Sequence, residues 1–378
     1  MKLRIPFNKP SLLGREQEYM AQVVHSGHWS GDGPFTKACE KLLSEQVGAR
    51  RTLLTSSCTD ALEMAALLLG CREGDEVIMP AFTFVSTANA FALRGARPVF
   101  ADIRRDTLNI DERQVASLIT PRTRAIVVVH YAGVGCEMPV LSDLARKHGL
   151  MLIEDNAHGL FGRYQGKPLG SFGQLATQSF HETKNVTCGE GGALVINDEA
   201  LIERAEILRE KGTNRSRFFR GQVDKYGWVD LGSSFLPSEI SAAMLLGQLE
   251  QQATIQSRRK SLWDRYAAEL GGWAASVGAT LPVVPDGCDQ AFHMFYLVMP
   301  TLESRQRLIA HLKERGILAV FHYLPLNQSE MAKRLGADQP CPVTEDISDR
   351  LVRLPFFASL EDAEQADVIE AVRTSAVG

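Results

Sequence analysis

Between about residues 50 and 200, short apolar runs alternate with segments whose apolar positions recur at helical spacing. Short, continuous apolar runs that are rich in β-branched residues predict buried strands. We expect these strands at Arg51–Thr55, Glu76–Met79, Pro98–Ile103, Ala125–Tyr131, Met151–Glu154, Ala176–Phe180 and Ala193–Asn197. The helical spacing predicts helices at Thr59–Leu69, Asp111–Leu118 and Pro139–His148. This alternation indicates an α/β fold with a large, mostly parallel sheet that is covered on both faces.

The second half of the chain has a different pattern. One long helical stretch runs from Pro237 to Leu270, with apolar residues at every third or fourth position. Beyond it, the pattern predicts strands at His293–Met299 and Ile317–His322 and helices at Glu303–Arg315 and Leu360–Val372. We therefore expect a large domain over residues 1–245 and a smaller C-terminal α/β domain over residues 246–378.

The composition excludes several classes of protein. The 378-residue chain has a net charge of −4, which indicates no basic surface for nucleic acid or for an anionic membrane. No apolar run approaches the ~20 residues of a membrane span, and the N-terminal sequence MKLRIPFNKP lacks the apolar segment of a signal peptide. The seven cysteines form no CxxC pair, which argues against a disulfide framework and against a zinc site. We therefore expect a cytoplasmic protein that holds no metal.

Two candidate binding segments follow predicted strands. In Thr55–Ala61 a strand end runs into a helix. The free N–H groups and the dipole at a helix N-terminus bind phosphate, and Ser and Thr hydroxyls add donors, although the same run can be an ordinary helix cap. Phe84 follows another strand, where an aromatic ring can stack on a bound ring or can simply pack in the core.

Two further residues suggest catalytic chemistry. Asp155 follows an apolar strand, at the edge of the sheet where ligands bind. A carboxylate there can keep the nitrogen of a pyridine cofactor protonated, or it can merely cap a turn. Lys184 lies in a loop between two predicted strands, just before the glycine-rich segment Gly189–Gly192. A lysine amine in such a loop can condense with an aldehyde, whereas a lysine taken alone is more often a solvated surface group.

Taken in order, these motifs resemble a known family. The segments TSSCTDAL, AFTFVSTANA, VHYAG, EDNAHG and SFHETKN, followed by GEGG, resemble those of the DegT/DnrJ/StrS sugar aminotransferases. The similarity runs nearly end to end, from Ile5 to Leu326. It implies fold type I, the aspartate aminotransferase-like fold, with pyridoxal 5′-phosphate (PLP) as cofactor. It also implies L-glutamate as the amino donor, a nucleotide-linked keto sugar as the acceptor, and a homodimer with shared active sites.

The resemblance implies a role for each matching position. Lys184 matches the Schiff-base lysine, and Asp155 matches the partner of the pyridine nitrogen. His158 matches a Gln/His position that contacts the phenolic oxygen of the cofactor, and Phe84 matches the aromatic residue that stacks on its ring. The phosphate cradle is implied at Cys58, Thr59, Asp60 and Ser179.

Two segments depart from the family pattern. A Gly-Tyr-Asn-x-Arg segment commonly reaches the phosphate across the dimer interface, and here Ser234 takes the Asn position and Leu236 the Arg position. The usual His of a later Tyr-x-Pro-Leu-His segment is Asn327. We place three residues among the substrate-binding candidates: His181, His322 and Asn327. Arg215 lies in a basic run that can bind a diphosphate or can form a solvated face.

Three segments point to one branch of this family. GDEVIMPAFTFVSTANAFALRGA, SFHETKN and EKGTNRSRFFRGQVDKYGW resemble enzymes that aminate C4 of a dTDP-4-keto-6-deoxyhexose for enterobacterial common antigen. A C3 keto group or a UDP or GDP carrier are alternatives, as are a PLP-dependent decarboxylase and a non-catalytic PLP-fold protein. Lys184 argues against the dehydratase branch, which has histidine at that position. The lack of GxGxxG after the first strand argues against a Rossmann dehydrogenase or epimerase.

Overall fold

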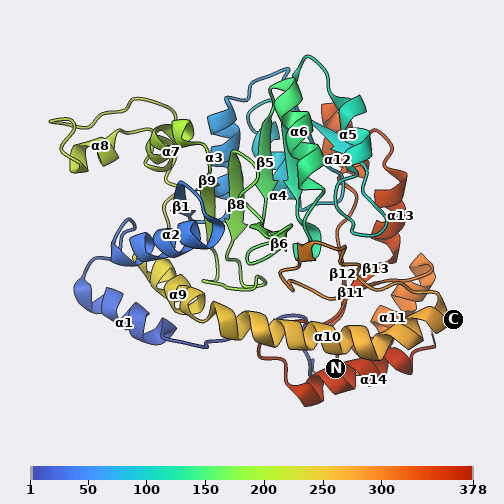
Figure 1. Cartoon of the computed structure of the whole chain (residues 1–378). Helices are drawn as coiled ribbons and strands as arrows, with labels where there is room; N and C mark the ends of the chain where they lie inside the picture. Colours follow the sequence, from blue (N-terminus) through green and yellow to red (C-terminus); the bar gives the residue numbers. More distant parts are fainter. Residues whose placement is uncertain (1–2, 377–378) are drawn as a thin grey trace.

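The computed structural model describes residues 3–376 and has a seven-stranded sheet at its centre (Figure 1). The strands are β1 (Arg51–Thr55), β2 (Glu76–Pro80), β3 (Arg97–Ala101), β4 (Thr123–Val129), β5 (Met151–Asp155), β8 (Leu175–Ser179) and β9 (Gly192–Ile196). Their order is β1-β9-β8-β5-β4-β2-β3, and β9 alone among them runs antiparallel to its neighbours. The predicted α/β class and the seven predicted strands are confirmed, with strand ends shifted by at most two residues. Residues 1–2 and 377–378 of the two predicted domains lie outside the described part of the chain.

Alternate residues of the central strands face two separate apolar layers. On β4, Val127 packs with the layer that contains α3 (Cys58–Leu69), α4 (Val85–Ala92) and α7 (Ile202–Arg209). Its neighbour Ile126 packs with the opposite layer, which contains α5 (Glu112–Leu118) and α6 (Met138–His148). The predicted helices of this region are confirmed as α3, α5 and α6. Because strands buried on both faces need apolar residues at every position, their sequences are continuous apolar runs.

The predicted long helix is wrong in one respect, because it is two helices. The helix α9 (Glu239–Glu250) ends at Gln251, whose φ of −99° and ψ of 12° leave the helical region, and α10 (Gln252–Val277) begins directly after it. The helix α9 packs against α1 (Glu16–Ser26) and α2 (Pro34–Val47), which the sequence pattern did not reveal. Burial against these helices makes α9 apolar around most of its surface, whereas α10 has a single buried stripe.

The C-terminal part has its own core and a small antiparallel sheet. This sheet has the order β11 (Tyr296–Val298), β13 (Leu351–Arg353), β12 (Val320–Phe321). The helices α10, α11 (Leu302–Glu314) and α14 (Asp362–Arg373) bury apolar residues against it, and Ile5 from the N-terminal segment joins the same cluster. The strands predicted at His293–Met299 and Ile317–His322 exist but are shorter. The strand β13 and the helices α12 (Glu330–Leu335) and α13 (Pro342–Arg350) were not predicted.

Two peripheral features complete the fold. The strands β10 (Cys288–Asp289), β6 (Arg163–Tyr164) and β7 (Lys167–Pro168) form a second small sheet. Residues 211–231, which we name the arm, carry α8 (Arg215–Phe219) and project from the body beyond α7 (Figure 1). Within residues 3–376, no helix is long and apolar enough to cross a membrane.

Candidate active site

Lys184 lies in the loop between β8 and β9, at the edge of the sheet where the parallel strands end. Its backbone N–H donates to the carbonyl of His181 at 2.9 Å, and the amide of the next residue, Asn185, donates to the carbonyl of Ala291 at 2.6 Å. From the N-terminal segment, the Asn8 amide donates to the carbonyl of Glu182 at 2.9 Å. These bonds hold the loop between the sheet, the C-terminal part and the N-terminal segment, so that the lysine side chain is partly buried.

The surroundings of the lysine amine favour its neutral form. Burial lowers the pKa of Lys184 to about 8, from an ordinary value of 10.5. The negative charges that Cys58 and Asp155 can carry oppose this shift, and the positive charge of Arg353 adds to it. An amine with this pKa is deprotonated in an appreciable fraction of molecules at neutral pH, and only the deprotonated amine is a nucleophile or a base.

Asp155 is the last residue of β5 and is 5% exposed. Its Oδ2 accepts a hydrogen bond from the Thr87 hydroxyl at 2.7 Å, and its Oδ1 accepts one from the Ala157 N–H at 3.2 Å. Burial raises the pKa of the Asp155 carboxyl, while these two bonds act to lower it. A carboxylate in this position is oriented but lacks a cationic partner at bonding distance among the described residues.

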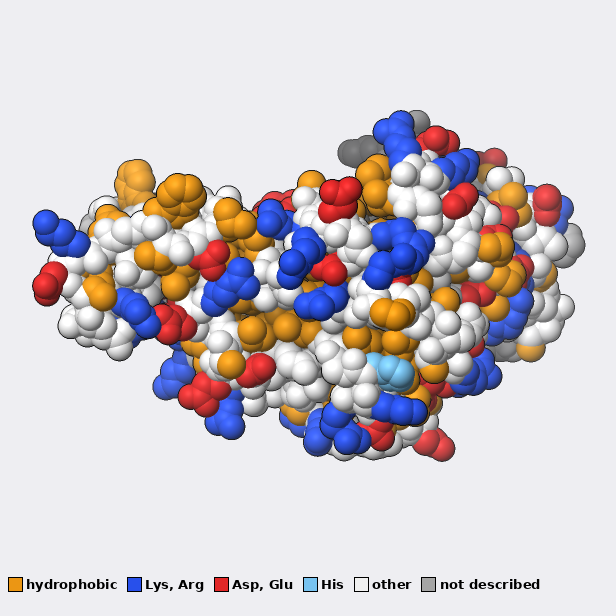
Figure 2. All heavy atoms as spheres, turned by 90° about the horizontal axis from the view of Figure 1, so that it is seen from above, with side chains coloured by type: hydrophobic (Ala, Val, Ile, Leu, Met, Phe, Trp, Pro, Cys, Tyr) orange, Lys and Arg blue, Asp and Glu red, His pale blue; other side chains and the backbone are white. Residues whose placement is uncertain are grey.

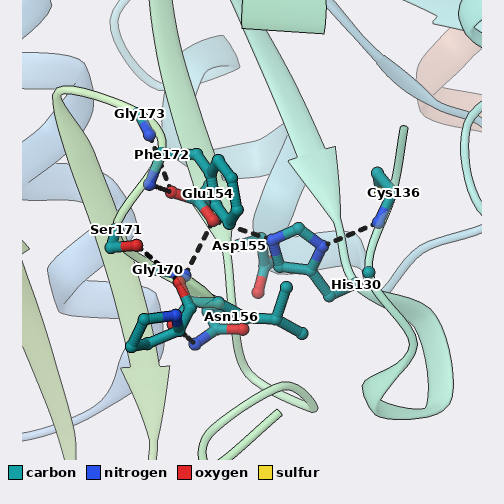
Figure 3. A network of polar contacts seen from close by, with 12 residues as sticks. His130, Cys136, Glu154, Asp155, Asn156, Gly170, Ser171, Phe172 and Gly173 are labelled. Atoms are coloured by element: carbon teal, nitrogen blue, oxygen red, sulfur yellow. Dashed lines mark hydrogen bonds and ion pairs between the residues drawn. The ribbon is translucent and has the colours of Figure 1, made fainter. Parts of the chain in front are cut away.

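The residue before Asp155 anchors the end of β5 from the other side (Figure 3). Side chains alternate along a strand, so Glu154 points away from Asp155. Glu154 accepts hydrogen bonds from the N–H groups of Gly170, Phe172 and Gly173, each at 2.7 Å, and its Oε2 lies 2.9 Å from His130 Nε2. Because Glu154 accepts hydrogen bonds from four donors, its side chain is held rigidly. It therefore fixes the position of the end of β5, to which Asp155 belongs.

The predicted phosphate cradle is the start of α3. Ser57 caps this helix, and its hydroxyl oxygen accepts the N–H of Asp60 at 3.0 Å. The N–H groups of Cys58 and Thr59 belong to the first turn, which has no acceptors inside the helix. The Thr59 hydroxyl lies 2.8 Å from that of Ser86, the second residue of α4. Two helix starts therefore meet at this point with a shared pair of hydroxyl groups.

Gly192 brings the sheet close to this helix start. A Cβ atom on Gly192 would lie 2.3 Å from the carbonyl carbon of Ser57 and 2.4 Å from the nitrogen of Cys58. Only glycine therefore lets β9 pass this close to α3. Gly192 pairs with Ser179 at the end of β8, which places Ser179 beside the same helix start.

A wall of stacked rings lies next to the lysine and the carboxylate. The rings of His158 and His293 stack with their centroids 4.3 Å apart. His158 Nε2 lies 3.3 Å from the Tyr323 hydroxyl, whereas its Nδ1 is buried and has no hydrogen-bond partner among the described residues. Burial lowers the pKa of His158, with further contributions from Lys184 and Arg353, so the ring is neutral and one of its nitrogens remains available.

Tyr323 links this wall to the other predicted aromatic residues. Its ring centroid lies 6.2 Å from that of Phe84, which is 57% exposed, and 3.5 Å from that of His322. His322 is buried, and its Nδ1 lies 2.8 Å from the Tyr131 hydroxyl. His322 thus packs against the buried side of the ring wall, whereas the ring of Phe84 is exposed.

The remaining predicted residues lie in different places. His181 is half exposed on the lysine loop, with Nδ1 at 3.0 Å from the Thr183 hydroxyl. Ser234 is exposed and lies just after the arm. The next residue, Phe235, accepts the N–H of Ser56 with its carbonyl at 2.8 Å. Both residues border the site without entering the group around Lys184 and Asp155.

Two predicted substrate contacts are not brought to the lysine within this chain. Arg215 lies in α8 on the projecting arm, where its guanidinium covers the Phe219 ring at 5.0 Å. Asn327 is buried, and its amide nitrogen donates to the Gln339 carbonyl and to Glu345 Oε1 at 3.0 and 2.7 Å. Both hydrogens of that amide are therefore used inside the fold.

The structure adds residues that the sequence interpretation missed. Thr87 holds Asp155, Ser86 meets the cradle, and His293 and Tyr323 form half of the ring wall. Ser86 and Thr87 lie in the AFTFVSTANA motif, so the two hydroxyl residues two and three positions after Phe84 were an available signal. His293 and Tyr323 belong to distant segments, and no local pattern distinguishes them.

Comparisons with known proteins agree with this geometry. The family model described as the DegT/DnrJ/EryC1/StrS aminotransferase family matches residues 10–373. The spore coat polysaccharide biosynthesis protein SpsC of Bacillus subtilis (strain 168) is 33% identical over 379 residues, which cover 98% of this chain and 96% of SpsC.

Solved structures show the same similarity. A protein from Streptococcus pneumoniae, described as a sugar aminotransferase and solved in its PMP form, is 28% identical and has a TM-score of 0.91, with 98% of each chain covered. Helicobacter pylori PseC, an aminotransferase involved in the biosynthesis of pseudoaminic acid, is 27% identical and has a TM-score of 0.87, again with 98% of each chain covered.

Proposed function

Because the chain belongs to the DegT/DnrJ/EryC1/StrS aminotransferase family and is a PLP-dependent sugar aminotransferase of fold type I, we propose its specific substrates. The amino group comes from L-glutamate and goes to the C4 keto group of a dTDP-4-keto-6-deoxyhexose, giving dTDP-4-amino-4,6-dideoxygalactose. The observation that carries the site assignment is that a partly buried amine, Lys184, and a buried carboxylate, Asp155, interact beside the open start of α3.

The residues present fit PLP on three structural grounds. The start of α3 offers free N–H groups that can bind a phosphate. These groups lie beside Gly192, where any side chain would clash with Ser57 and Cys58. Asp155 lacks the cation that its burial calls for, and a protonated pyridine nitrogen would supply it. The buried Nδ1 of His158 lacks a partner, and the phenolic oxygen of the cofactor would provide one.

Each residue of the site would then have a separate role in the reaction. When bound, PLP supplies an electron sink for the carbon that loses a proton. Lys184 would act as the base at the donor's α-carbon, because its lowered pKa keeps a neutral fraction of the amine available. Asp155, oriented by Thr87, would hold the pyridine nitrogen in its protonated form. The exposed ring of Phe84 would help to bind the cofactor ring and to exclude water.

We further propose a homodimer in which the arm covers the partner. The arm exposes Phe219 at 65%, Tyr226 at 52% and Trp228 at 80%, which is unusual for aromatic residues of a monomer. Figure 2 shows hydrophobic side chains gathered on the projecting lobe. A second copy of the chain, which would bring Arg215 and Ser234 to its neighbour's site, accounts for both the exposure and their distance from Lys184.

The substrate assignment rests on the sequence segments that resemble the C4-aminating branch, and one experiment tests it. The PLP-loaded protein is incubated with L-glutamate and a panel of dTDP-, UDP- and GDP-linked keto sugars, including 3-keto and 4-keto forms. The products are identified by mass spectrometry and NMR. We expect a 4-amino sugar from the dTDP-4-keto-6-deoxyhexose, and conversion of a 3-keto or UDP-linked sugar alone would replace this assignment by the alternative.

A further inference from the structure

Residues 291–293 form a strained turn beside the active site. Phe292 has a φ of 49°, in the left-handed region that a non-glycine residue adopts only at a cost in free energy. Its neighbour Ala291 donates its N–H to the carbonyl of Gly133 at 2.9 Å. A Cβ atom on Gly133 would lie 2.7 Å from the Cβ atom of Ala291 and 2.9 Å from the carbonyl oxygen of His158. The turn therefore packs closely against the backbone that carries His158.

A buried arginine holds the carbonyl groups of this turn. Arg259, on α10, is 2% exposed. It donates from Nε to the Phe292 carbonyl at 2.8 Å and from Nη2 to the His293 carbonyl at 2.5 Å. Burial lowers the pKa of Arg259 to about 9. A buried charge is costly unless it is well bonded, and backbone strain persists only where the surrounding structure enforces it. The fold thus uses a charged group to hold His293 in one place.

The side chain of Asn185 fixes the ring of His293. Its amide nitrogen donates to the Ala291 carbonyl at 2.6 Å and to Gln256 Oε1 at 3.0 Å. Because a backbone carbonyl can only accept, this bond distinguishes the amide nitrogen of Asn185 from the amide oxygen. The oxygen lies 2.9 Å from His293 Nδ1, which must therefore carry a proton. Asn185 directly follows Lys184, so one residue connects the lysine loop to this ring.

The ring of His293 in turn restrains the ring of His158. Burial lowers the pKa of His293 well below its ordinary value, and the charges of His158 and Lys184 add to the shift, so the His293 ring is neutral. The two rings stack with their centroids 4.3 Å apart and their planes at 17°. Because two flat rings in face contact cannot turn independently, the plane of His293 determines the plane of His158. That plane decides where the unpartnered Nδ1 of His158 points.

We propose that His293 is a positioning residue, which holds the His158 ring in the plane that directs its Nδ1–H at the phenolic oxygen of PLP. That oxygen accepts a hydrogen bond, so the single proton of the neutral His158 ring is needed on Nδ1. The Tyr323 hydroxyl, 3.3 Å from His158 Nε2, then donates to that nitrogen. The role of His293 rests on the proposed contact between His158 and the cofactor, and it is independent of which keto sugar is the acceptor.

A double-mutant cycle on PLP affinity, measured by titration of the cofactor-free proteins, tests this role. His158→Ala should weaken PLP binding about 10- to 100-fold, the range for a lost hydrogen bond to a charged group. His293→Leu should weaken it about 3- to 10-fold, the range for a lost aromatic pair. In the His158→Ala background, His293→Leu should have no further effect, because the ring that it positions is absent. Effects that multiply in the double variant would overturn the proposal.

A comparison of His293→Phe with His293→Leu separates stacking from the filling of space. Both variants lose the hydrogen bond to Asn185, but only Phe has a flat ring that can stack on His158. His293→Phe should therefore bind PLP more tightly than His293→Leu. Equal losses in the two variants would contradict a role in stacking. His148→Phe, at the exposed end of α6, is the matched control and should bind PLP as the wild type does.

A second readout follows His158 itself in the resting, PLP-loaded protein. In histidine labelled with an NMR-active nitrogen isotope, the chemical shifts of the two ring nitrogens show which of them carries the proton. The signals that disappear in His158→Ala identify this residue. We expect the proton on Nδ1 in the wild type and an averaged signal from both tautomers in His293→Leu. The same tautomer with the same line width in both proteins would refute the positioning role.

The same variants distinguish the role of His293 from that of His158. If His158→Ala binds PLP as tightly as the wild type, the proposed contact with the phenolic oxygen is wrong, and His293 has nothing to position. If His158→Ala weakens binding and His293→Leu weakens it further, the contact stands and the role of His293 alone is wrong. Melting temperatures show whether each variant folds. If His293→Leu does not fold, His293→Gln replaces it, because Gln has no ring and can still donate to Asn185. Full PLP affinity in His293→Gln would then overturn the proposal.

Discussion

The lowered pKa of Lys184 has a measurable effect on the stability of the cofactor-free protein. In the unfolded chain the amine has its ordinary pKa of 10.5, and in the folded chain the pKa is about 8. The unfolded state therefore binds more protons between these two values, so the free energy of unfolding rises with pH across this window. Below the folded pKa the group carries its full destabilising cost, and above the unfolded pKa the cost disappears.

The size of this cost follows from the two pKa values. At 1.36 kcal/mol per pKa unit, the difference between 10.5 and about 8 corresponds to about 3 kcal/mol. Replacing Lys184 by Met, which has a similar length and no charge, removes the cost. We therefore expect the free energy of unfolding of Lys184→Met to exceed that of the wild type by up to about 3 kcal/mol near neutral pH. The advantage should shrink steadily as the pH rises from about 8 to about 10.5.

Urea unfolding of both cofactor-free proteins, at several pH values across that window, measures the difference. The exposed residue Lys41, whose side chain is 76% exposed, gives the control Lys41→Met, for which no comparable gain is expected. A gain for Lys184→Met that is the same at all pH values would mean improved packing alone. Equal stability of Lys184→Met and wild type near neutral pH would show that the amine is not desolvated, and the argument for a neutral lysine would fail.

Three further predictions concern the cofactor site and the arm. Thr87→Val removes a donor that lowers the pKa of Asp155, so the acidic limb of the activity profile should move to higher pH and turnover should fall about 10- to 100-fold, as steady-state kinetics can show. Gly192→Ala puts a Cβ atom within 2.3 Å of Ser57, so PLP affinity measured by titration should fall sharply, and unchanged affinity would contradict the cradle. Trp228→Asp on the arm should shift a dimer toward monomer in analytical ultracentrifugation, and an unchanged dimer would show that the arm is not the contact.

The parts of the fold that the sequence revealed are those with a single local cause. Strands buried on both faces are continuous apolar runs, and so the strands of the large sheet were found within two residues of their ends. Asp155 ends one of these strands and Lys184 lies in the loop after another, and because parallel strands end at one edge, their placement on the same edge was predictable. The break at Gln251 was not predictable in this way, because the apolar spacing continues through it.

The residues that the sequence did not reveal depend on contacts between distant segments. Arg353 lies on a strand of three residues, LVR, and nothing in that triplet shows that its Nε is buried without a hydrogen-bond partner. Tyr323 lies 165 positions after the histidine that it contacts. Such pairs are defined by tertiary packing alone, and a local pattern of apolar and polar positions contains no information about them.

The unsatisfied groups of the site imply that ligands and folding are coupled. The neighbouring buried carboxylate of Glu154 is fully satisfied by three N–H groups and His130. At the site, by contrast, the buried carboxylate of Asp155 lacks a cation and the buried Nδ1 of His158 lacks a hydrogen-bond partner. Each deficit raises the free energy of the ligand-free fold, and each is removed by a ligand that binds the folded chain alone. The protein should therefore gain stability when PLP binds at Asp155 and His158, and the melting temperature measured with and without PLP tests this.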